Sequence, residues 1–226
     1  MRRVGILYHP LLSVAAPLAR DLASRLEALS ISSWLCSAWE EDTARSSVAG
    51  SDLLFSIGGD GTILRTARIA LPWPVPILGV ILGRLGFMAE LSVAEARQRL
   101  EDVASGQGWL DERAMLQIEV VTDGHARGLH HALNDAVVGR GAPGKTVERQ
   151  VRIEGEVISD FKGDGLIMAT ATGSTAYSLA AGGPILYPQS RDIVLQPLVP
   201  HLASDTALVL SPTTTVEVEV REACSP

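Results

Sequence analysis

An apolar run, a glycine-rich turn and the start of a helical pattern follow one another directly in residues 53–62. Leu53 to Ile57 has the composition of a buried strand, and three glycines then surround a single acid, Asp60. Glycines let a backbone come close to a bulky anion, and the first amides of the following helix point toward it. This order predicts a parallel α/β unit with a phosphate-binding turn at the carboxyl end of a strand.

Asp60 is the unusual member of this turn, because phosphate-cradling loops rarely place an acid among their amides. One interpretation gives the carboxylate a role in catalysis, either accepting the proton of an attacking hydroxyl or holding a metal. The other interpretation is structural, since Asp-Gly is a common turn dipeptide. The turn by itself leaves both interpretations open.

The elements around the turn favour an α/β arrangement for the first part of the chain. Val4 to Tyr8 and Ile77 to Ile81 are predicted strands, and Ser13 precedes a helix with apolar residues at helical spacing. A further helix is expected from about Ile63 to Ala70, before the prolines that follow it. Strands that alternate with helices predict a parallel sheet with flanking helices.

The pattern changes after Leu91. Ser92 and Glu95 have the spacing of a capping box and predict one more helix, which extends to about Ala104. Alternation of period two follows, for example from Val216 to Val220, and predicts an all-β part. We therefore expect an α/β domain over residues 1–92 and a β-sandwich domain over residues 93–226, with a ligand cleft between them.

Composition excludes several classes of protein. The net charge is −7 and the basic residues are scattered, which argues against a nucleic-acid partner. The first apolar run stops at Tyr8, too short for an export signal or a membrane span. Cys36 and Cys224 lie far apart without metal-ligand spacing, as is typical of a reducing compartment. We expect a cytoplasmic protein without a membrane partner.

A second glycine-rich block lies in residues 162–186. The segment from Thr170 to Ala176 is rich in small hydroxyl residues around Gly173, and a short helix is expected from Thr175 to Ala181. Small side chains let a flat ring or a sugar lie against the backbone. The structural alternative is a tight turn in which Ser and Thr only cap a helix. The number of such residues favours a binding site.

Four segments together resemble the NAD kinase family. They are residues 58–62, 82–87, 132–135 and 164–184, and they occur in the family's order. Gly-Gly-Asp-Gly alone is shared with diacylglycerol, sphingosine and 6-phosphofructo-kinases, whereas the block from Gly173 to Ser178 is typical of NAD kinases. The resemblance implies phosphorylation of the adenosine 2′-hydroxyl of NAD to give NADP. The alternatives are a lipid or sugar kinase and a non-catalytic pseudokinase that binds a dinucleotide.

The resemblance also implies roles for individual residues. Asp60 matches the catalytic aspartate. The expected phosphate or ATP site is lined by Gly58, Gly59, Gly61, Thr62 and Arg65. The expected NAD site comprises Asn134, Asp135, Lys162, Asp164, Thr172, Thr175, Ala176 and Tyr177. For Arg65 and Arg68, an exposed helix face is an equally good interpretation.

Further expectations concern partners. The resemblance implies ATP or polyphosphate as donor, a divalent metal such as Mg²⁺ or Mn²⁺ with unknown ligands, and a homodimer or homotetramer. Family members generally continue beyond the position that corresponds to Pro226, so we expect either a short variant or a sequence that ends early, and an incomplete sheet would leave an edge for a partner subunit to cover. His130 and His131 are adjacent on a predicted strand and should face opposite ways, which argues against a metal pair.

A competing motif occurs at Gly139 to Thr146, which has the letters of a P-loop. A working P-loop needs a helix after its lysine, so that the helix amides meet the phosphate. The residues that follow, Val147 to Ile153, predict a strand instead. We expect a loop between two strands.

Overall fold

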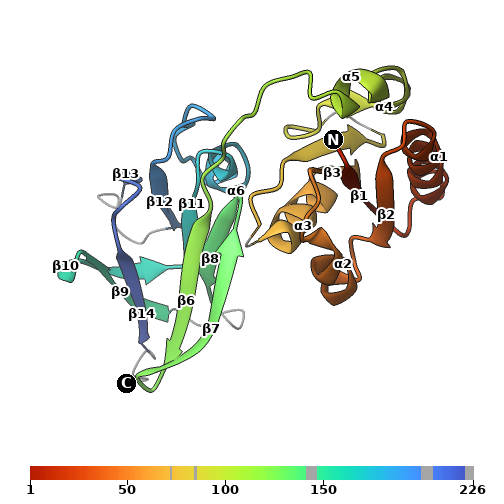
Figure 1. Cartoon of the computed structure of the whole chain (residues 1–226). Coiled ribbons are helices and arrows are strands. Elements are labelled where there is room, and N and C mark those ends of the chain that lie inside the picture. Colours follow the sequence, from red (N-terminus) through yellow and green to blue (C-terminus); the bar gives the residue numbers. More distant parts are fainter. Residues whose placement is uncertain (72, 84–85, 141–146, 200–205, 222–226) are drawn as a thin grey trace. The chain divides into compact units, whose positions relative to one another are not determined.

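The N-terminal unit is organised by parallel strand pairing. A computed structural model describes residues 1–71, 73–83, 86–140, 147–199 and 206–221. The chain forms two compact units, Met1–Leu110 and Asp111–Pro226. The first contains β1 (Arg3–Tyr8), α1 (Ala15–Ala28), β2 (Ser32–Ser37), α2 (Glu41–Val48), β3 (Leu53–Gly58), α3 (Asp60–Ala70), β4 (Ile77–Ile81), β5 (Leu91–Ser92), α4 (Val93–Gln98) and α5 (Leu100–Ala104). Its strands form one parallel sheet in the order β2-β1-β3-β4-β5 (Figure 1).

Helices cover both faces of this sheet. Ile6 and Phe55 point to the face where α1, α4 and α5 pack, and the next residue of each strand, Leu7 or Ser56, points the other way. The apolar residues of α2 and α3 bury the second face, with Leu7, Leu54 and Ile69 in one cluster. Both faces are therefore buried, which explains the nearly continuous apolar composition of β3.

The predicted α/β arrangement is confirmed. Strands β1, β3 and β4 lie where the sequence placed them, and α3 begins earlier than expected, at Asp60 itself. The first helix starts at Ala15, and its N-cap residue is Val14 rather than Ser13. The strand β2 and the helix α2 were not predicted, because both are short and their sequences are mixed in polarity.

The capping box at Ser92 is present. The Glu95 amide donates to Ser92 Oγ at 3.3 Å, and the Ser92 amide donates to the Glu95 carboxylate at 2.8 Å. The helix that it starts is interrupted at Arg99, so α4 and α5 are separate. Both belong to the first unit because Ala96 and Leu100 pack into its core with α1. The two units divide between Leu110 and Asp111, whereas the expected domain boundary lay near residue 92.

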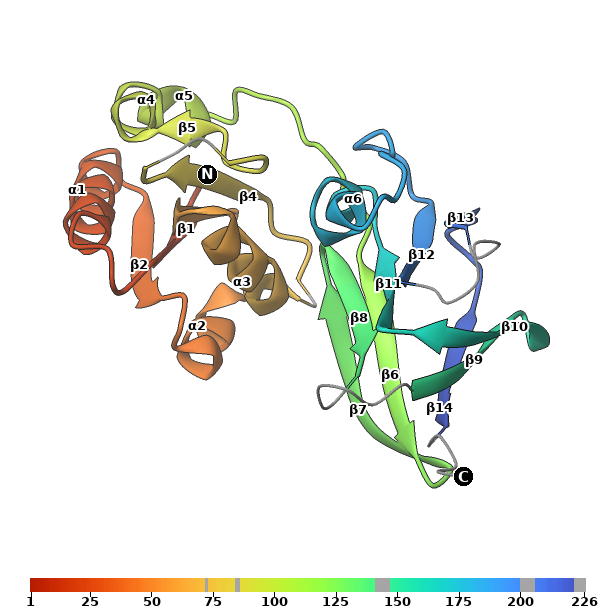
Figure 2. The same ribbon diagram turned by 180° about the vertical axis from the view of Figure 1, so that it is seen from behind.

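The C-terminal unit is built from antiparallel strands. They are β6 (Leu116–Thr122), β7 (His125–Ala132), β8 (Asp135–Gly139), β9 (Val147–Ile153), β10 (Glu156–Gly163), β11 (Gly165–Ala169), β12 (Ile193–Leu198), β13 (Leu208–Leu210) and β14 (Val216–Arg221). They form sheets in the orders β10-β9-β14, β13-β12-β11-β8 and β6-β7 (Figure 2). Two short helical segments, η1 (Gly173–Thr175) and α6 (Tyr177–Ala180), stand where one helix was expected.

Two of these sheets pack against each other. Val151 of β9 shares a buried cluster with Leu166 of β11 and Leu195 of β12. The predicted strand after the P-loop letters is present as β9, so the described residues from Val147 form a strand where a P-loop requires a helix. Positions 141–146 and 222–226 lie outside the described residues. No helix in the described ranges is both long and apolar enough to span a membrane.

Replacing Ser92 by alanine should destabilise the N-terminal unit by about 1 kcal/mol, because the Glu95 amide loses its acceptor. Chemical denaturation followed by circular dichroism measures this loss. Ser24→Ala on the exposed face of α1 is the matched control and should change the unfolding free energy by less than about 0.5 kcal/mol. Equal stability of the two variants would contradict the role of the capping box.

Candidate functional site

The glycine turn after β3 brings the first turn of α3 against the end of the strand. Gly59 is extended, with φ −117° and ψ −173°, and its carbonyl accepts the amide of Thr62 at 2.8 Å. A Cβ on Gly58 would lie 2.2 Å from Thr62 Oγ1. Glycine is therefore required at position 58 by close packing inside the turn. Gly61 is exposed, and a Cβ there would meet no atom within 4 Å.

Asp60 is held by the segment that follows β4. Its Oδ2 accepts the Phe87 amide at 2.9 Å, and its Oδ1 accepts the Met88 amide at 3.3 Å. A Cβ on Gly86 would lie 2.2 Å from Oδ1, so only glycine lets this segment pass so close to the carboxylate. The half-buried carboxylate is thus fixed by two backbone donors. This geometry goes beyond what a simple Asp-Gly turn requires.

Phe87 lies beside Asp60 and was not among the residues predicted for the site. The residue is 84% exposed, although its own amide binds Asp60. A large aromatic ring held open to solvent beside a carboxylate can stack against a flat ligand ring. Its place in the segment 82–87 was the available sequence signal.

Thr62 lies below the surface of the turn. It is 1% exposed, and within the described ranges its Oγ1 has no hydrogen-bond partner. Beneath it, Thr66 Oγ1 donates to the carbonyl oxygen of Thr62 or to Ser56 Oγ, each 2.9 Å away. These hydroxyls join α3 to β3, so the position of Thr62 fits support of the turn as well as contact with a ligand.

The sheet edge beside the turn is hollow. A cleft of about 580 Å³ lies next to the carboxyl ends of β1 and β4. Leu12, Val14, Ile81 and Leu82 contribute to its apolar lining. The Leu82 amide donates to the Gly58 carbonyl at 2.8 Å, which places one wall of the cleft directly beside the glycine turn. The N-terminal unit therefore has room for a small molecule at this edge.

In the C-terminal unit, the second glycine block packs on Asn134. A Cβ on Gly173 would lie 2.0 Å from the Asn134 carbonyl oxygen, which also accepts the Thr170 amide at 2.9 Å. Thr170 Oγ1 donates to the Leu133 carbonyl at 2.5 Å and accepts the Gly173 amide at 3.1 Å. The structure thus brings the 133–135 segment and the Gly173 turn together, as the predicted site requires.

The side chains of Asn134 and Asp135 are poorly satisfied. Asn134 Oδ1 is buried and has no partner among the described residues. Asp135 is half-buried at the start of β8, and this burial raises the pKa of its carboxyl group above the ordinary value. Both groups can therefore accept hydrogen bonds from a ligand that brings its own donors.

The residues of this block divide into two groups by their burial. Ser174 is buried, and its Oγ donates to the Ala171 carbonyl at 2.7 Å, as a structural turn requires. Thr172, Thr175 and Ala176 are half-buried, and Tyr177 is 49% exposed. The binding interpretation therefore rests on the second group.

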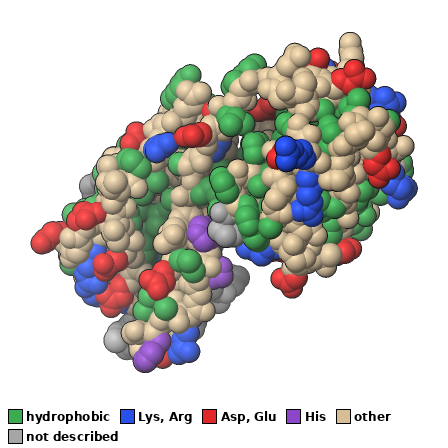
Figure 3. All heavy atoms as spheres, in the orientation of Figure 1, with side chains coloured by type: hydrophobic (Ala, Val, Ile, Leu, Met, Phe, Trp, Pro, Cys, Tyr) green, Lys and Arg blue, Asp and Glu red, His purple; other side chains and the backbone are tan. Residues whose placement is uncertain are grey.

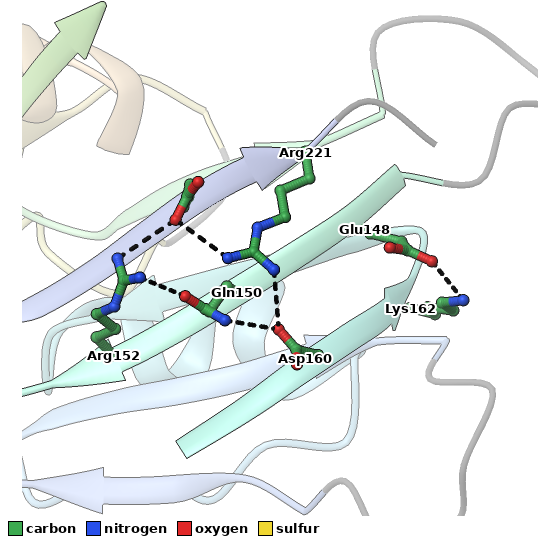
Figure 4. Close-up of polar contacts among 7 residues, drawn as sticks. Glu148, Gln150, Arg152, Asp160, Lys162 and Arg221 are labelled. Atoms are coloured by element: carbon green, nitrogen blue, oxygen red, sulfur yellow. Dashed lines mark hydrogen bonds and ion pairs between the residues drawn. The ribbon is translucent and has the colours of Figure 1, made fainter. Parts of the chain in front are cut away.

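Lys162 and Asp164 lie where β10 passes into β11. Lys162 forms an ion pair with Glu148 of the neighbouring strand (Figure 4). Asp164 pairs with Arg140 at 3.1 Å. The buried Arg149 donates to the carbonyls of Gly163 at 3.0 Å and Asp164 at 3.4 Å. Both predicted site residues are thus in ion pairs that a ligand would have to rearrange or share.

Basic and acidic side chains lie among one another on the face of the molecule that Figure 3 shows.

Within the described ranges, no three His, Cys, Asp or Glu side chains are grouped as metal ligands. His130 is exposed and His131 is half-buried on β7. A divalent cation that is carried by substrate phosphates needs only one or two protein carboxylates.

A carboxylate that two backbone amides fix beside a glycine turn, at the carboxyl edge of a parallel sheet, fits the site of a phosphotransferase. Residues 10–107 match the ATP-NAD kinase N-terminal domain, and residues 133–225 match the ATP-NAD kinase C-terminal domain. The chain belongs to the NAD kinase family.

Several relatives of this chain are named NAD kinase. The chain is 46% identical over 220 residues to an NAD kinase of Dehalococcoides mccartyi (strain CBDB1), covering 97% of this chain and 78% of the relative. It is 39% identical to an NAD kinase of Chloroflexus aggregans, with coverages of 98% and 80%.

Solved structures share the fold. Yeast NADH kinase in complex with NADH aligns with a TM-score of 0.91 at 24% identity, covering all of this chain and 70% of that chain. An NAD kinase from Archaeoglobus fulgidus in complex with ATP aligns with a TM-score of 0.72 at 25% identity, with coverages of 97% and 81%.

The hydrogen bonds of Thr170 to Leu133 and Gly173, here called the Thr170 brace, should stabilise the C-terminal unit. Thr170→Val keeps the shape of the side chain but leaves the Gly173 amide without its acceptor, which should cost about 1–3 kcal/mol. Urea unfolding of the C-terminal unit measures the change. Thr122→Val on the exposed end of β6 is the matched control and should be nearly neutral. A neutral Thr170→Val would show that the brace contributes little.

Proposed function

We propose that the chain transfers the terminal phosphoryl group of ATP to the 2′-hydroxyl of the adenosine ribose of NAD, which gives NADP and ADP. The observation that carries the proposal is the Asp60 carboxylate, which two backbone amides fix at the mouth of the glycine turn. Membership of the NAD kinase family supports the acceptor, and the relative with bound ATP supports the donor. The matched C-terminal domain disfavours a lipid or sugar kinase.

In this reaction Asp60 orients the acceptor. The ribose hydroxyl oxygen bonds to the terminal phosphorus, and the bond from phosphorus to the bridging oxygen of ADP breaks. ADP leaves with the electron pair, and the hydroxyl proton passes to Asp60. Phosphoryl transfer needs mainly alignment and charge neutralisation, so a carboxylate held by the Phe87 and Met88 amides suits the task.

The glycines, Arg65 and the metal would act on the donor. The backbone at the half-buried Gly59 and the exposed Gly61 can approach phosphate oxygens closely, and Arg65 adds a cation. A divalent cation carried by the donor phosphates would neutralise charge there. Inorganic polyphosphate offers the same phosphate chemistry and is the alternative donor.

The C-terminal unit would recognise the acceptor. Asn134 and Asp135 would accept hydrogen bonds from the adenosine. Lys162, Asp164, Thr172, Thr175, Ala176 and Tyr177 are proposed to bind the rest of NAD. A homo-oligomer and a cytoplasmic location stay predictions.

The decisive experiment compares Asp60→Asn with the unmodified chain. NADP formation from NAD and ATP should fall by about a hundredfold or more, because the substituted amide cannot accept the proton. NAD binding by calorimetry should be retained. Asp102→Asn on the exposed face of α5 is the matched control. Turnover of a lipid or sugar in place of NAD, or binding without turnover in the unmodified chain, would overturn the proposal.

Burial of Asp135 predicts a pH dependence of NAD binding. Its pKa is raised above 3.8, and the ionised form is the better acceptor, so NAD affinity should fall as acidification protonates this group. The unliganded unit should respond in the opposite direction. A raised carboxyl pKa in the folded state makes the contribution of Asp135 to stability largest at low pH, and this contribution is lost as pH rises through that pKa.

Calorimetry at a series of pH values, from neutral pH down through the ordinary range of an aspartate carboxyl, tests this dependence. Asp135→Asn should bind NAD more weakly and remove the part of the pH dependence that Asp135 contributes. Asp123→Asn, in the exposed turn between β6 and β7, is the matched control and should keep the full dependence. An unchanged dependence in Asp135→Asn would refute the assignment.

A further inference from the structure

Three side chains from different parts of the N-terminal unit stack at the carboxyl edge of its sheet. His9 follows β1, Trp39 follows β2, and Arg65 lies in α3. The Arg65 guanidinium carbon is 4.4 Å from the centroid of the Trp39 ring. The His9 ring lies 4.4 Å from the same tryptophan, tilted by 56°. Arg65 is thus held over an aromatic face.

This environment distinguishes Arg65 from its basic neighbours. Arg45 of α2 pairs with Glu41 at 2.8 Å, and Arg68 of α3 approaches the same glutamate at 3.8 Å. Among the residues that the structure describes, no carboxylate forms an ion pair with Arg65. Its charge therefore stays available for an anion, while Trp39, itself 40% exposed, restricts its motion.

The stack lies beside the glycine turn. Gly61 and Arg65 are four residues apart on α3 and so share one face of the helix. Long helical side chains lean toward the helix N-terminus, which directs Arg65 toward the exposed Gly61. The His9 amide donates to the Ile57 carbonyl at 2.9 Å, so His9 lies next to the residue that precedes Gly58.

We infer that Trp39 and His9 are positioning residues that hold Arg65 over the glycine turn to receive the condensed phosphate chain of the donor. The inference rests on the proposed function. A guanidinium binds two phosphate oxygens at once, and holding it in place beforehand lowers the entropy lost on binding. Nucleoside triphosphate and inorganic polyphosphate both present this chain. Arg65 already lies over one face of the Trp39 ring, so the inference gives the tryptophan to the cation and makes stacking on a purine base an outcome of the test.

The test compares Trp39→Leu with Trp39→Phe and a matched control, Trp109→Leu, at a tryptophan that is 88% exposed. Trp39→Leu should raise KM for ATP about threefold to tenfold, with little change in kcat or in KM for NAD. It should raise the inhibition constant of inorganic tripolyphosphate against ATP by the same factor. Trp39→Phe should recover most of the loss, and Trp109→Leu should match the unmodified chain.

A double-mutant cycle identifies the residue through which Trp39 acts. In an Arg65→Gln background, Trp39→Leu should have no further effect, because the cation that it positions is gone. In His9→Gln, the side-chain oxygen can still accept a hydrogen bond from the backbone amide of Leu11. This variant should shift KM for ATP in the same direction by a smaller factor. It serves as the second variant if Trp39→Leu does not fold.

Three results would overturn the inference. They are additive effects of Trp39→Leu and Arg65→Gln, an equal change in Trp109→Leu, and a loss of ATP affinity without a change for tripolyphosphate. The last result would assign Trp39 to the base. Failure of the proposed function is distinct, because the unmodified chain would then form no NADP with either donor.

Discussion

The close approach of Gly86 to Asp60 is the contact on which the rest of the site depends. The segment after β4 can donate two amides to the carboxylate only because position 86 has no Cβ. That segment reaches the turn because β3 and β4 are parallel neighbours with Gly58 opposite Ile81. The orientation of Asp60 therefore depends both on the order of the strands and on the glycine at position 86.

In the C-terminal unit a glycine also packs closely against a residue of the predicted site, but among the described residues the carboxylate there has fewer hydrogen-bond donors. Gly173 packs against the Asn134 backbone, at a distance that no side chain would allow. Asp60 already has two backbone donors, whereas burial raises the pKa of Asp135 and Asn134 Oδ1 lacks a partner among the described residues. Under the proposed function, the first carboxylate is prepared to orient a hydroxyl. The side chains of Asn134 and Asp135 would instead receive their hydrogen bonds from the ligand.

Much of this arrangement follows from sequence, but not all of it. The apolar run into Gly58 predicts β3 and α3 because both are locally determined. The capping box at Ser92 is equally local and is present. The break at Arg99 and the division after Leu110 depend on how α4 and α5 pack against α1, which no local pattern records. The nearness of Asn134 to Gly173 came from the family resemblance, since β8 and β11 pair across a long sequence separation.

Arg65 shows why local patterns stop short of function. Its spacing in α3 allowed a phosphate contact or an exposed helix face, and the structure adds a stacked position that neither interpretation contained. The parallel sheet explains this, because every strand of the order β2-β1-β3-β4 ends at one edge. Each end delivers one group there: Trp39, His9, Asp60 and Phe87. Two aromatic rings, an imidazole and a carboxylate thus become neighbours of one glycine turn through topology, although no spacing in the chain connects them.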